Sequence, residues 1–383
     1  MGGNEWKYVK ECLDTHWVSY VGSFVERFEN ELAEIADAQH CVATNAGTAA
    51  LHLALILFGV EPETEVVMPA ISFVAPANAI RYCGAWPTFI DIDPTTWQID
   101  LNKLEDFLRN HCEQNSSGKL INRETGRPVA ALLPVHLFGG MAEVQPIADL
   151  AARFGLPLIE DAAECLGAKY RGQGIAAPIE GFDPKQRIVI TSFNGNKIVT
   201  TGGGGALFCD DELTAARAKH ISTTAKTDPV EFHHDVVGYN YRLSNVLAAI
   251  GVGQLELLDQ YVLRKKTIAS RYEQAFAEVE GIETAPETET VESSYWMYTI
   301  RINRKSRELV DWLIERNVQV RPIWFPVARL PEFQNHCFSY AIDFAEQFYQ
   351  SSLSIPCSVV LEEEQQSRVI QLIKQWLADG AGS

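Results

Sequence analysis

Lys197 is the residue of this chain whose surroundings most clearly suggest chemistry. It follows the apolar run 188–190 after a Ser-Phe pair, and it precedes four consecutive glycines, 202–205. Upstream, Asp161 ends the strand-like segment 157–160. A lysine that can form a Schiff base and a carboxylate that can pair with a pyridinium nitrogen are the two protein groups that pyridoxal phosphate chemistry requires. The two segments therefore predict this cofactor.

A third segment could bind the phosphate of such a cofactor. Gly47, Thr48 and Ala49 follow a predicted strand, 41–44, and open a predicted helix over 48–57. A helix N-terminus presents free backbone N–H groups and the positive end of the helix dipole to an anion. An ordinary strand-turn-helix connection, with the threonine as a cap, explains the same residues.

The other two segments also have simpler explanations when each is taken alone. An aspartate after a strand is often a helix N-cap, as Asp161 could be. A lysine in a glycine-rich turn, such as Lys197, is often a solvated loop residue. A P-loop does not fit, because its glycines should precede the lysine. The order of the three segments along the chain is what favours the cofactor.

Apolar, β-branched runs alternate with helical patterns over residues 41–209. The near-continuous apolar character of these runs is typical of a sheet buried on both faces, and the alternation indicates an α/β domain with right-handed crossovers. Seven strands are predicted, at 41–44, 65–69, 86–91, 129–134, 157–160, 187–192 and 206–209. The helices predicted between them are 48–57, 75–82, 101–109 and 144–154.

The pattern changes after about residue 243. The segment 245–277 is predicted to form one long helix or two in succession. Short strands are expected near 298–302 and 318–321, with helices at 307–316 and 362–377. We therefore expect a large α/β domain over 1–250 and a smaller α+β domain over 251–383. The segments 110–127 and 226–237 are expected to be exposed loops.

Composition limits the classes of protein. The chain has 383 residues and a net charge of −18, which argues against nucleic acid and against an anionic membrane surface as partners. No apolar run is long enough to span a bilayer, and the N-terminal residues do not resemble a signal peptide. The eight cysteines include no CxxC pair, which predicts neither a disulfide framework nor a zinc site and favours a cytoplasmic location.

Several motifs in order resemble the DegT/DnrJ/EryC1/StrS family of sugar aminotransferases over nearly the whole chain. The resemblance implies the type I fold of aspartate aminotransferase, with a seven-stranded, mostly parallel sheet between helices. The motifs begin with Trp17-Val18-Ser19 and continue through 24–29, 45–53, 160–167, 192–205, 238–242 and 353–356.

The resemblance also implies a role for individual residues. Lys197 would hold pyridoxal phosphate covalently and shuttle protons, and Asp161 would pair with the ring nitrogen. Phe73 takes the place of an aromatic that stacks on the ring, although it could equally be a core residue. The cofactor's phosphate would be held by Gly47, Thr48, Ala49 and Ser192, with Asn240 of the neighbouring subunit completing the site.

Two positions depart from the commoner family pattern. Glu164 stands where many members have Gln or His near the phenolic oxygen of the cofactor, so its carboxyl must be protonated or face away. The glycines 202–205 replace a Gly-Glu-Gly-Gly segment. Together with the segment 82–85, both departures resemble a narrower branch, which aminates C4 of UDP-4-keto-6-deoxy-N-acetylglucosamine on routes to bacillosamine- and legionaminic-type sugars.

The resemblance therefore implies a homodimeric enzyme that transfers the amino group of L-glutamate to a nucleotide-linked keto sugar. Lys197 favours transamination over dehydration, because dehydrating relatives carry His at this position. A C3 aminotransferase, a dehydratase and a non-catalytic regulatory relative remain alternatives.

Some polar residues outside these motifs could also belong to a site. His136 could border it, although a structural histidine explains it as well. His233, His234 and Asp235 suggest a metal cluster, but adjacent histidines in a strand point to opposite faces. Arg321 and Trp324 could meet the substrate.

Overall fold

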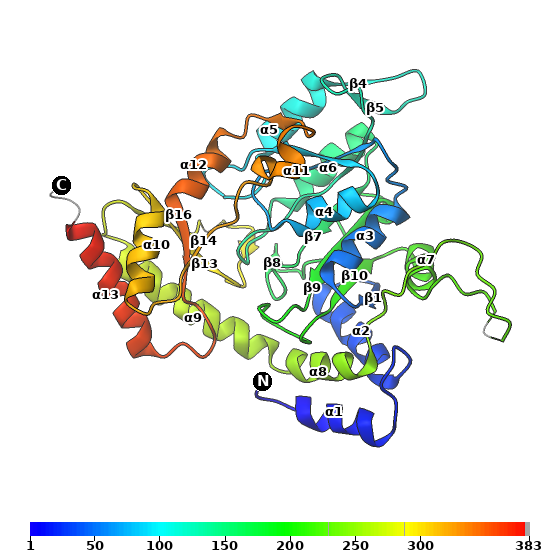
Figure 1. Cartoon of the computed structure of the whole chain (residues 1–383), viewed down its shortest axis with the longest axis horizontal. Helices are drawn as coiled ribbons and strands as arrows, with labels where there is room; N and C mark the ends of the chain where they lie inside the picture. Colours follow the sequence, from blue (N-terminus) through cyan, green and yellow to red (C-terminus); the bar gives the residue numbers. More distant parts are fainter. Residues whose placement is uncertain (229, 287, 380–383) are drawn as a thin grey trace.

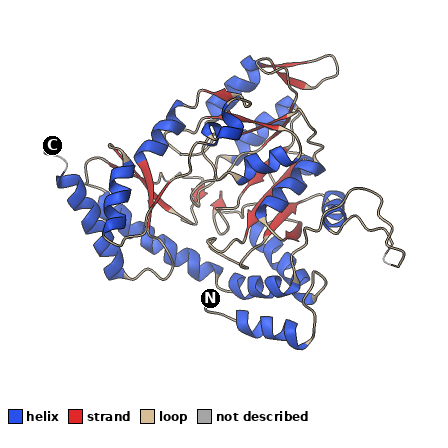
Figure 2. Cartoon of the chain, in the orientation of Figure 1, coloured by secondary structure: helices blue, strands red, loops and turns tan. Residues whose placement is uncertain are grey.

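The computed structural model describes residues 1–228, 230–286 and 288–379. A large sheet runs through the middle of the first part of the chain, with helices on both of its faces (Figures 1 and 2). Within the described residues it has eight strands, in the order β1-β10-β9-β7-β6-β2-β3-β15. All neighbouring strands are parallel except β10 with β1 and with β9. The strands are β1 (His40–Thr44), β10 (Gly205–Cys209), β9 (Arg187–Ser192), β7 (Leu158–Asp161), β6 (Val129–Leu132), β2 (Glu65–Pro69), β3 (Trp86–Ile90) and β15 (Ser339–Tyr340).

Alternate residues of each strand pack on opposite faces of this sheet, as the pleat requires. In β9, Ile188 and Ile190 belong to the apolar core on one face, while Val189 belongs to the core on the other. The first face is covered by α3 (Gly47–Leu57), α4 (Ala75–Tyr82) and α7 (Glu212–Ser222). The second is covered by α2 (Ser23–Ala36), α5 (Leu101–Asp106), α6 (Val144–Phe154) and α8 (Asn245–Leu255).

The seven predicted strands are all present, but the sheet contains an eighth. β15 comes from the C-terminal part of the chain and pairs with β3 at the sheet edge. A two-residue strand carries too little periodicity to be found in the sequence. Residues 101–109 do not form one regular helix: α5 ends at Asp106 and a π-helical turn follows, Phe107–His111. The predicted loop 110–127 contains a hairpin of β4 (Cys112–Gln114) and β5 (Leu120–Asn122).

A second, smaller sheet lies at the other end of the molecule (Figure 1). It has the strand order β11-β13-β16-β14 within the described residues, built from Ile282–Thr284, Tyr298–Ile302, Ser352–Ile355 and Arg321–Pro322. The helices α10 (Ser306–Glu315), α12 (Asp343–Ser351) and α13 (Glu363–Asp379) pack near it (Figure 1). The boundary between two domains at residues 250 and 251 stays a prediction.

The segment 245–277 forms two helices, α8 and α9 (Leu258–Phe276), which the sequence left open. The pair bends by 56° and leads from the large sheet to the small one. Among the described residues no single helix is long and apolar enough to cross a membrane. Only α8 and α9 taken together have the length and apolar composition of a membrane span, and the bend separates them.

The remaining elements are small or peripheral. They are α1 (Glu5–Asp14), β8 (Lys169–Tyr170), which pairs with β12 (Val291–Glu292), the 3-10 turns Pro184–Gln186 and Val327–Arg329, and α11 (Pro331–Gln334).

Candidate active site

The carboxyl ends of several strands meet at one edge of the large sheet. Because β1, β9 and β7 all run in the same direction, Thr44, Ser192 and Asp161 lie at this edge. In open α/β sheets, ligands bind beyond the carboxyl ends of the strands. A cavity of about 240 Å³ opens there, and seven of the predicted residues line it: Gly47, Thr48, Phe73, Asp161, Glu164, Ser192 and Lys197.

Lys197 is placed by the turn that follows β9. Its backbone N–H donates to the carbonyl of Asn194 at 2.9 Å, which closes the turn and directs the lysine toward the cavity. The amine lies 3.8 Å from the centroid of the Trp296 ring, over its face. A cation in this position is attracted by the ring quadrupole.

Asp161 is the last residue of β7, and it is buried. Its Oδ1 accepts a hydrogen bond from the backbone N–H of Ala163 at 2.9 Å. Burial raises the pKa of Asp161, while this hydrogen bond and the charge of Lys197 oppose the rise. A protonated ring nitrogen placed against this carboxylate would stabilise its charged form.

Glu164 lies one turn beyond Asp161 and is also buried. Its Oε2 accepts a hydrogen bond from the backbone N–H of Phe138 at 2.9 Å. Burial raises the pKa of Glu164 to about 7, against the opposing effect of the Lys197 charge. The carboxyl faces the cavity. With its pKa raised to about 7, it is partly neutral near physiological pH in the cofactor-free protein, as the predicted position near a phenolic oxygen requires.

The start of α3 forms an anion cradle. Ala46 precedes the helix in an extended conformation and makes no side-chain cap, so the first N–H groups of the helix have no side-chain acceptor at the Ncap position. Gly47 lies so close to Ser192 that a Cβ on the glycine would come within 2.8 Å of the Cβ of the serine. The serine hydroxyl is thereby held beside the helix N-terminus. Ala49 lies in the same first turn, but its side chain does not line the cavity. Only its backbone N–H could therefore contribute to binding a phosphate.

Aromatic side chains form the open wall of the cavity. Phe73 is 54% exposed, which excludes the core position that the sequence left open for it. Its ring meets that of Trp324 edge to face at 5.5 Å, and Trp324 stacks on Trp296 at 6.3 Å. The indole N–H of Trp324 is buried beside the carboxyl of Glu164, and its interaction with that carboxyl lowers the pKa of Glu164.

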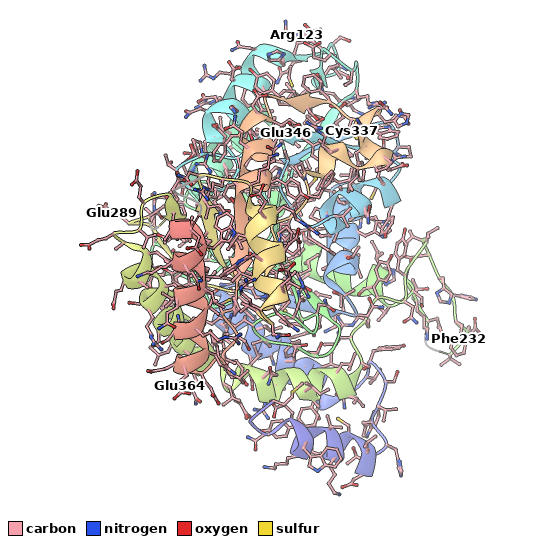
Figure 3. All side chains as sticks on the ribbon, turned by 60° about the vertical axis from the view of Figure 1, so that its left-hand side comes forward. Arg123, Phe232, Glu289, Cys337, Glu346 and Glu364 are labelled. Atoms are coloured by element: carbon pink, nitrogen blue, oxygen red, sulfur yellow. The ribbon has the colours of Figure 1, made fainter. Side chains whose placement is uncertain are left out.

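Asn240 lies outside the cavity. Its side chain is exposed, and its carbonyl accepts a hydrogen bond from the side-chain amide of Asn45 at 3.1 Å. This contact places it near the start of α3 but on the outer surface. The described residues of the long segment before it, 226–228 and 230–237, extend away from the body of the molecule, with Phe232 near the tip (Figures 1 and 3).

The remaining polar candidates are structural or separate from the cavity. His136 is fully buried, accepts a hydrogen bond from Ala142 N–H at Nδ1, and contacts Glu160 through Nε2 at 3.0 Å. His233 and His234 do not share a partner: the first contacts Glu231 and the second the carbonyl of Thr224. Within the described part of the chain no group of three or more His, Cys, Asp or Glu side chains could hold a metal ion.

Arg321 is exposed on β14 and does not line the cavity, whereas Trp324 does. Sequence reasoning missed Trp296, Ser72, Asn194 and Asn196, which also line it. The asparagines flank Gly195 directly before the lysine, so their position was a usable signal. Trp296 lies 99 residues after Lys197, and only its place between two tyrosines, Tyr295 and Tyr298, marks it.

The residues present fit pyridoxal phosphate. The helix start and Ser192 suit a phosphate, Asp161 suits a protonated ring nitrogen, and Lys197 suits the aldehyde. The raised pKa of Glu164 leaves a further group that can donate a hydrogen bond to a polar heterocycle.

Comparisons with known proteins agree with this arrangement. The model of the DegT/DnrJ/EryC1/StrS aminotransferase family matches residues 1–374. GDP-perosamine synthase of Caulobacter vibrioides is 35% identical, over 98% of this chain and 96% of that protein. A putative pyridoxal phosphate-dependent aminotransferase of Bacillus subtilis, EpsN, is 34% identical over 99% and 96%. The crystal structure of the aminotransferase TlmJ from Streptoalloteichus hindustanus matches with a TM-score of 0.88 and 27% identity, over 100% and 98% of the two chains.

The matches show the fold expected from the sequence, an enzyme, and dependence on pyridoxal phosphate. This chain belongs to the DegT/DnrJ/EryC1/StrS aminotransferase family.

Proposed function

We propose that this enzyme transfers the amino group of L-glutamate to C4 of a nucleotide-linked 4-keto-6-deoxy sugar. The observation that carries the proposal is the meeting of Lys197, Asp161 and the N-terminus of α3 around one cavity. A lysine beside two buried carboxyls and an anion cradle is equipped to hold the cofactor and to move protons next to it.

Each residue would have a distinct task. When bound, pyridoxal phosphate supplies an electron sink that allows an amino group to be exchanged at carbon. The amine of Lys197 would hold the cofactor covalently and then carry a proton to or from the reacting carbon. Asp161 would keep the ring nitrogen protonated, and Ser192 with the first N–H groups of α3 would bind the phosphate. Glu164 would donate a hydrogen bond from its neutral carboxyl.

The nucleotide separates two versions of the proposal. The departures at Glu164 and at glycines 202–205 led us to expect UDP-4-keto-6-deoxy-N-acetylglucosamine. The similarity to GDP-perosamine synthase instead favours a GDP-linked sugar. We propose amination at C4 in both versions, and the two differ only in the nucleotide that the sugar carries.

We also propose a homodimer in which Asn240 acts in the partner's site. Exposed apolar side chains in the described parts of the segment, 226–228 and 230–237, support this assembly, since exposed apolar surface is typical of interaction sites. Val230 and Val237 are 81% and 80% exposed, and Phe232 is 62% exposed. The eight free cysteines keep a cytoplasmic location as a prediction.

The first experiment is the visible absorption spectrum of the purified protein before and after L-glutamate is added. A band that forms with pyridoxal phosphate and disappears with glutamate would support the cofactor, Lys197 and the donor together. A protein that stays colourless with both additions would contradict the proposal and favour a regulatory role.

A panel of UDP- and GDP-linked keto sugars then decides the substrate. The enzyme is incubated with each sugar and L-glutamate, and the products are identified by mass spectrometry and NMR. A 4-amino sugar as the product supports the proposal. The nucleotide of the sugar that reacts distinguishes the UDP-linked version from the GDP-linked one. A 3-amino sugar or a deoxygenated product contradicts amination at C4.

A further inference from the structure

Trp296 contacts Lys197 and the turn before it in two separate ways. Its ring face lies 3.8 Å from the lysine amine. Its indole N–H donates to the backbone carbonyl of Asn196, the residue directly before the lysine, at 2.8 Å. One side chain thus fixes both the backbone that carries the lysine and the charged end of the lysine itself.

The tryptophan is itself held rigidly. It is 4% exposed, and its backbone N lies so close to Gly139 that a Cβ on the glycine would come within 2.4 Å of it. Its carbonyl accepts a hydrogen bond from the ammonium of Lys265, which is buried on α9, at 2.9 Å. The same ammonium donates to the carbonyl of Cys357 at 3.0 Å. The ring that faces Lys197 is therefore anchored to the second half of the chain.

We propose that Trp296 is a positioning residue that keeps the amine of Lys197 in the cavity whenever the amine is not bonded to the cofactor. The inference rests on the proposed role of Lys197 and deepens it. A flexible lysine side chain has many rotamers, and a ring face that attracts its ammonium selects those that stay in the cavity. The hydrogen bond to Asn196 fixes the direction from which the side chain starts.

The two contacts can be separated by substitution. Trp296→Phe keeps an aromatic face and loses the hydrogen bond to Asn196, whereas Trp296→Leu loses both. Trp312 provides a matched control, because the guanidinium of Arg316 lies 3.8 Å from its ring centroid, away from the cavity. Trp312→Leu therefore removes an equivalent cation–ring contact without touching the site.

The test measures the reactivity of Lys197 in the cofactor-free protein. All variants are labelled briefly with acetic anhydride, and modification of Lys197 is measured by mass spectrometry relative to the exposed Lys185. We expect Trp296→Leu to raise the relative labelling of Lys197 by about two- to thirty-fold, the range of cation–ring attraction. Trp296→Phe should raise it less, and Trp312→Leu should leave it unchanged.

A second readout follows the reaction with L-glutamate. In Trp296→Leu the rate at saturating glutamate should fall, while the concentration for half-saturation stays unchanged. Unchanged labelling of Lys197 in a folded Trp296→Leu protein, or equal changes in Trp312→Leu, would overturn the inference. If Trp296→Leu does not fold, Trp296→Phe decides the same question. Because labelling needs no cofactor, it remains decisive even if the wild-type protein forms no visible band and the proposed function fails.

Discussion

Glu164 combines full burial with a carboxyl that faces a predicted polar ligand. A buried carboxylate without a cation against it is costly, so such a group takes up a proton instead. The hydrogen bond from Phe138 N–H and the charge of Lys197 reduce this cost but do not remove it, and the pKa stays at about 7. The residue can thus donate a hydrogen bond that a carboxylate could not.

In the cofactor-free protein, the proton on Glu164 should make the free energy of unfolding depend on pH. When unfolded, Glu164 has its ordinary pKa of 4.5, so between about pH 4.5 and 7 the folded state binds more protons than the unfolded state. Stability therefore falls as pH rises through this window. Glu164→Gln removes this contribution, so the variant should gain up to about 3 kcal/mol relative to wild type between pH 5 and 8.

Urea unfolding of both proteins at several pH values measures this difference. Asp161 contributes in the same direction, because its pKa is also raised, and its charge acts on Glu164, so the comparison measures the coupled pair. A constant difference between the variant and wild type across pH would show that Glu164 does not carry the proton.

Lys197→Ala should abolish both the visible band and turnover. The physical reason is that no other lysine lines the cavity among the described residues. Lys185→Ala, a substitution of an exposed lysine outside the cavity, should change neither property. Absorption spectra and activity assays check this, and a normal band in Lys197→Ala would remove the lysine from its proposed role.

Residue types at short spacing made part of the site predictable. Asp161 and Ser192 end strands, and Gly47, Thr48 and Lys197 follow the end of a strand by three to five residues. Because parallel strands end at the same edge of a sheet, these residues come together there. Trp296 and Trp324 could not be assigned in this way. They come from the second half of the chain, and only the packing of that half against the large sheet brings them to the cavity.

At the scale of elements, the N-terminus of α3 is held in place by its neighbours. Gly205 on β10 lies against the backbone of Ala46 and Gly47, where a Cβ would come within 2.6 Å of main-chain atoms. Gly47 in turn lies against Ser192. The strand β10 therefore sets the position of the anion cradle through main-chain contact, and β9 does so through the short side chain of Ser192.

Gly205→Ala should disturb this cradle. The added Cβ would meet backbone that cannot rotate away, and overpacking of this kind costs about 1–3 kcal/mol. We expect weaker binding of pyridoxal phosphate and a lower melting temperature. Gly195→Ala is the control, because nothing lies within 4 Å of the Cβ position of Gly195.

Cofactor titration and thermal unfolding of the two glycine variants measure the effect. Equal affinities for pyridoxal phosphate in Gly205→Ala and wild type would mean that the cradle tolerates a shift of α3.

The helices and strands that could be predicted are those in which the hydrophobic pattern extends over several residues. Seven strands of the large sheet and helices such as α3, α4 and α6 were found because each buries a run of several residues. The π-helical turn after Asp106, the β4–β5 hairpin and β15 escaped prediction. Each is short, and its backbone follows from tertiary packing and not from local sequence.

At the scale of the whole molecule, the predicted role of Asn240 requires a second copy of the chain. Mixing two inactive variants tests this requirement. If Asn240 of one chain serves the site that contains Lys197 of the other, a heterodimer of Lys197→Ala and Asn240→Ala contains one intact site. Unfolding and refolding an equal mixture should then restore about a quarter of wild-type activity, because half of the dimers are mixed and each has one working site.

The separate variants, refolded alone, provide the baseline. Activity of the mixture no higher than the average of the two would show that Asn240 acts within its own chain or has no role in the site.

The strand β15 has a consequence for the folding of the chain during its synthesis. Residues 323–348 return from the small sheet to the large one, where Phe333 and Phe348 join the apolar core beside β3. While the ribosome is still making this segment, the large sheet has an uncovered edge and a core that lacks these rings. A nascent chain of the first 250 residues would thus expose apolar surface, and the enzyme reaches its final packing only near the end of its synthesis.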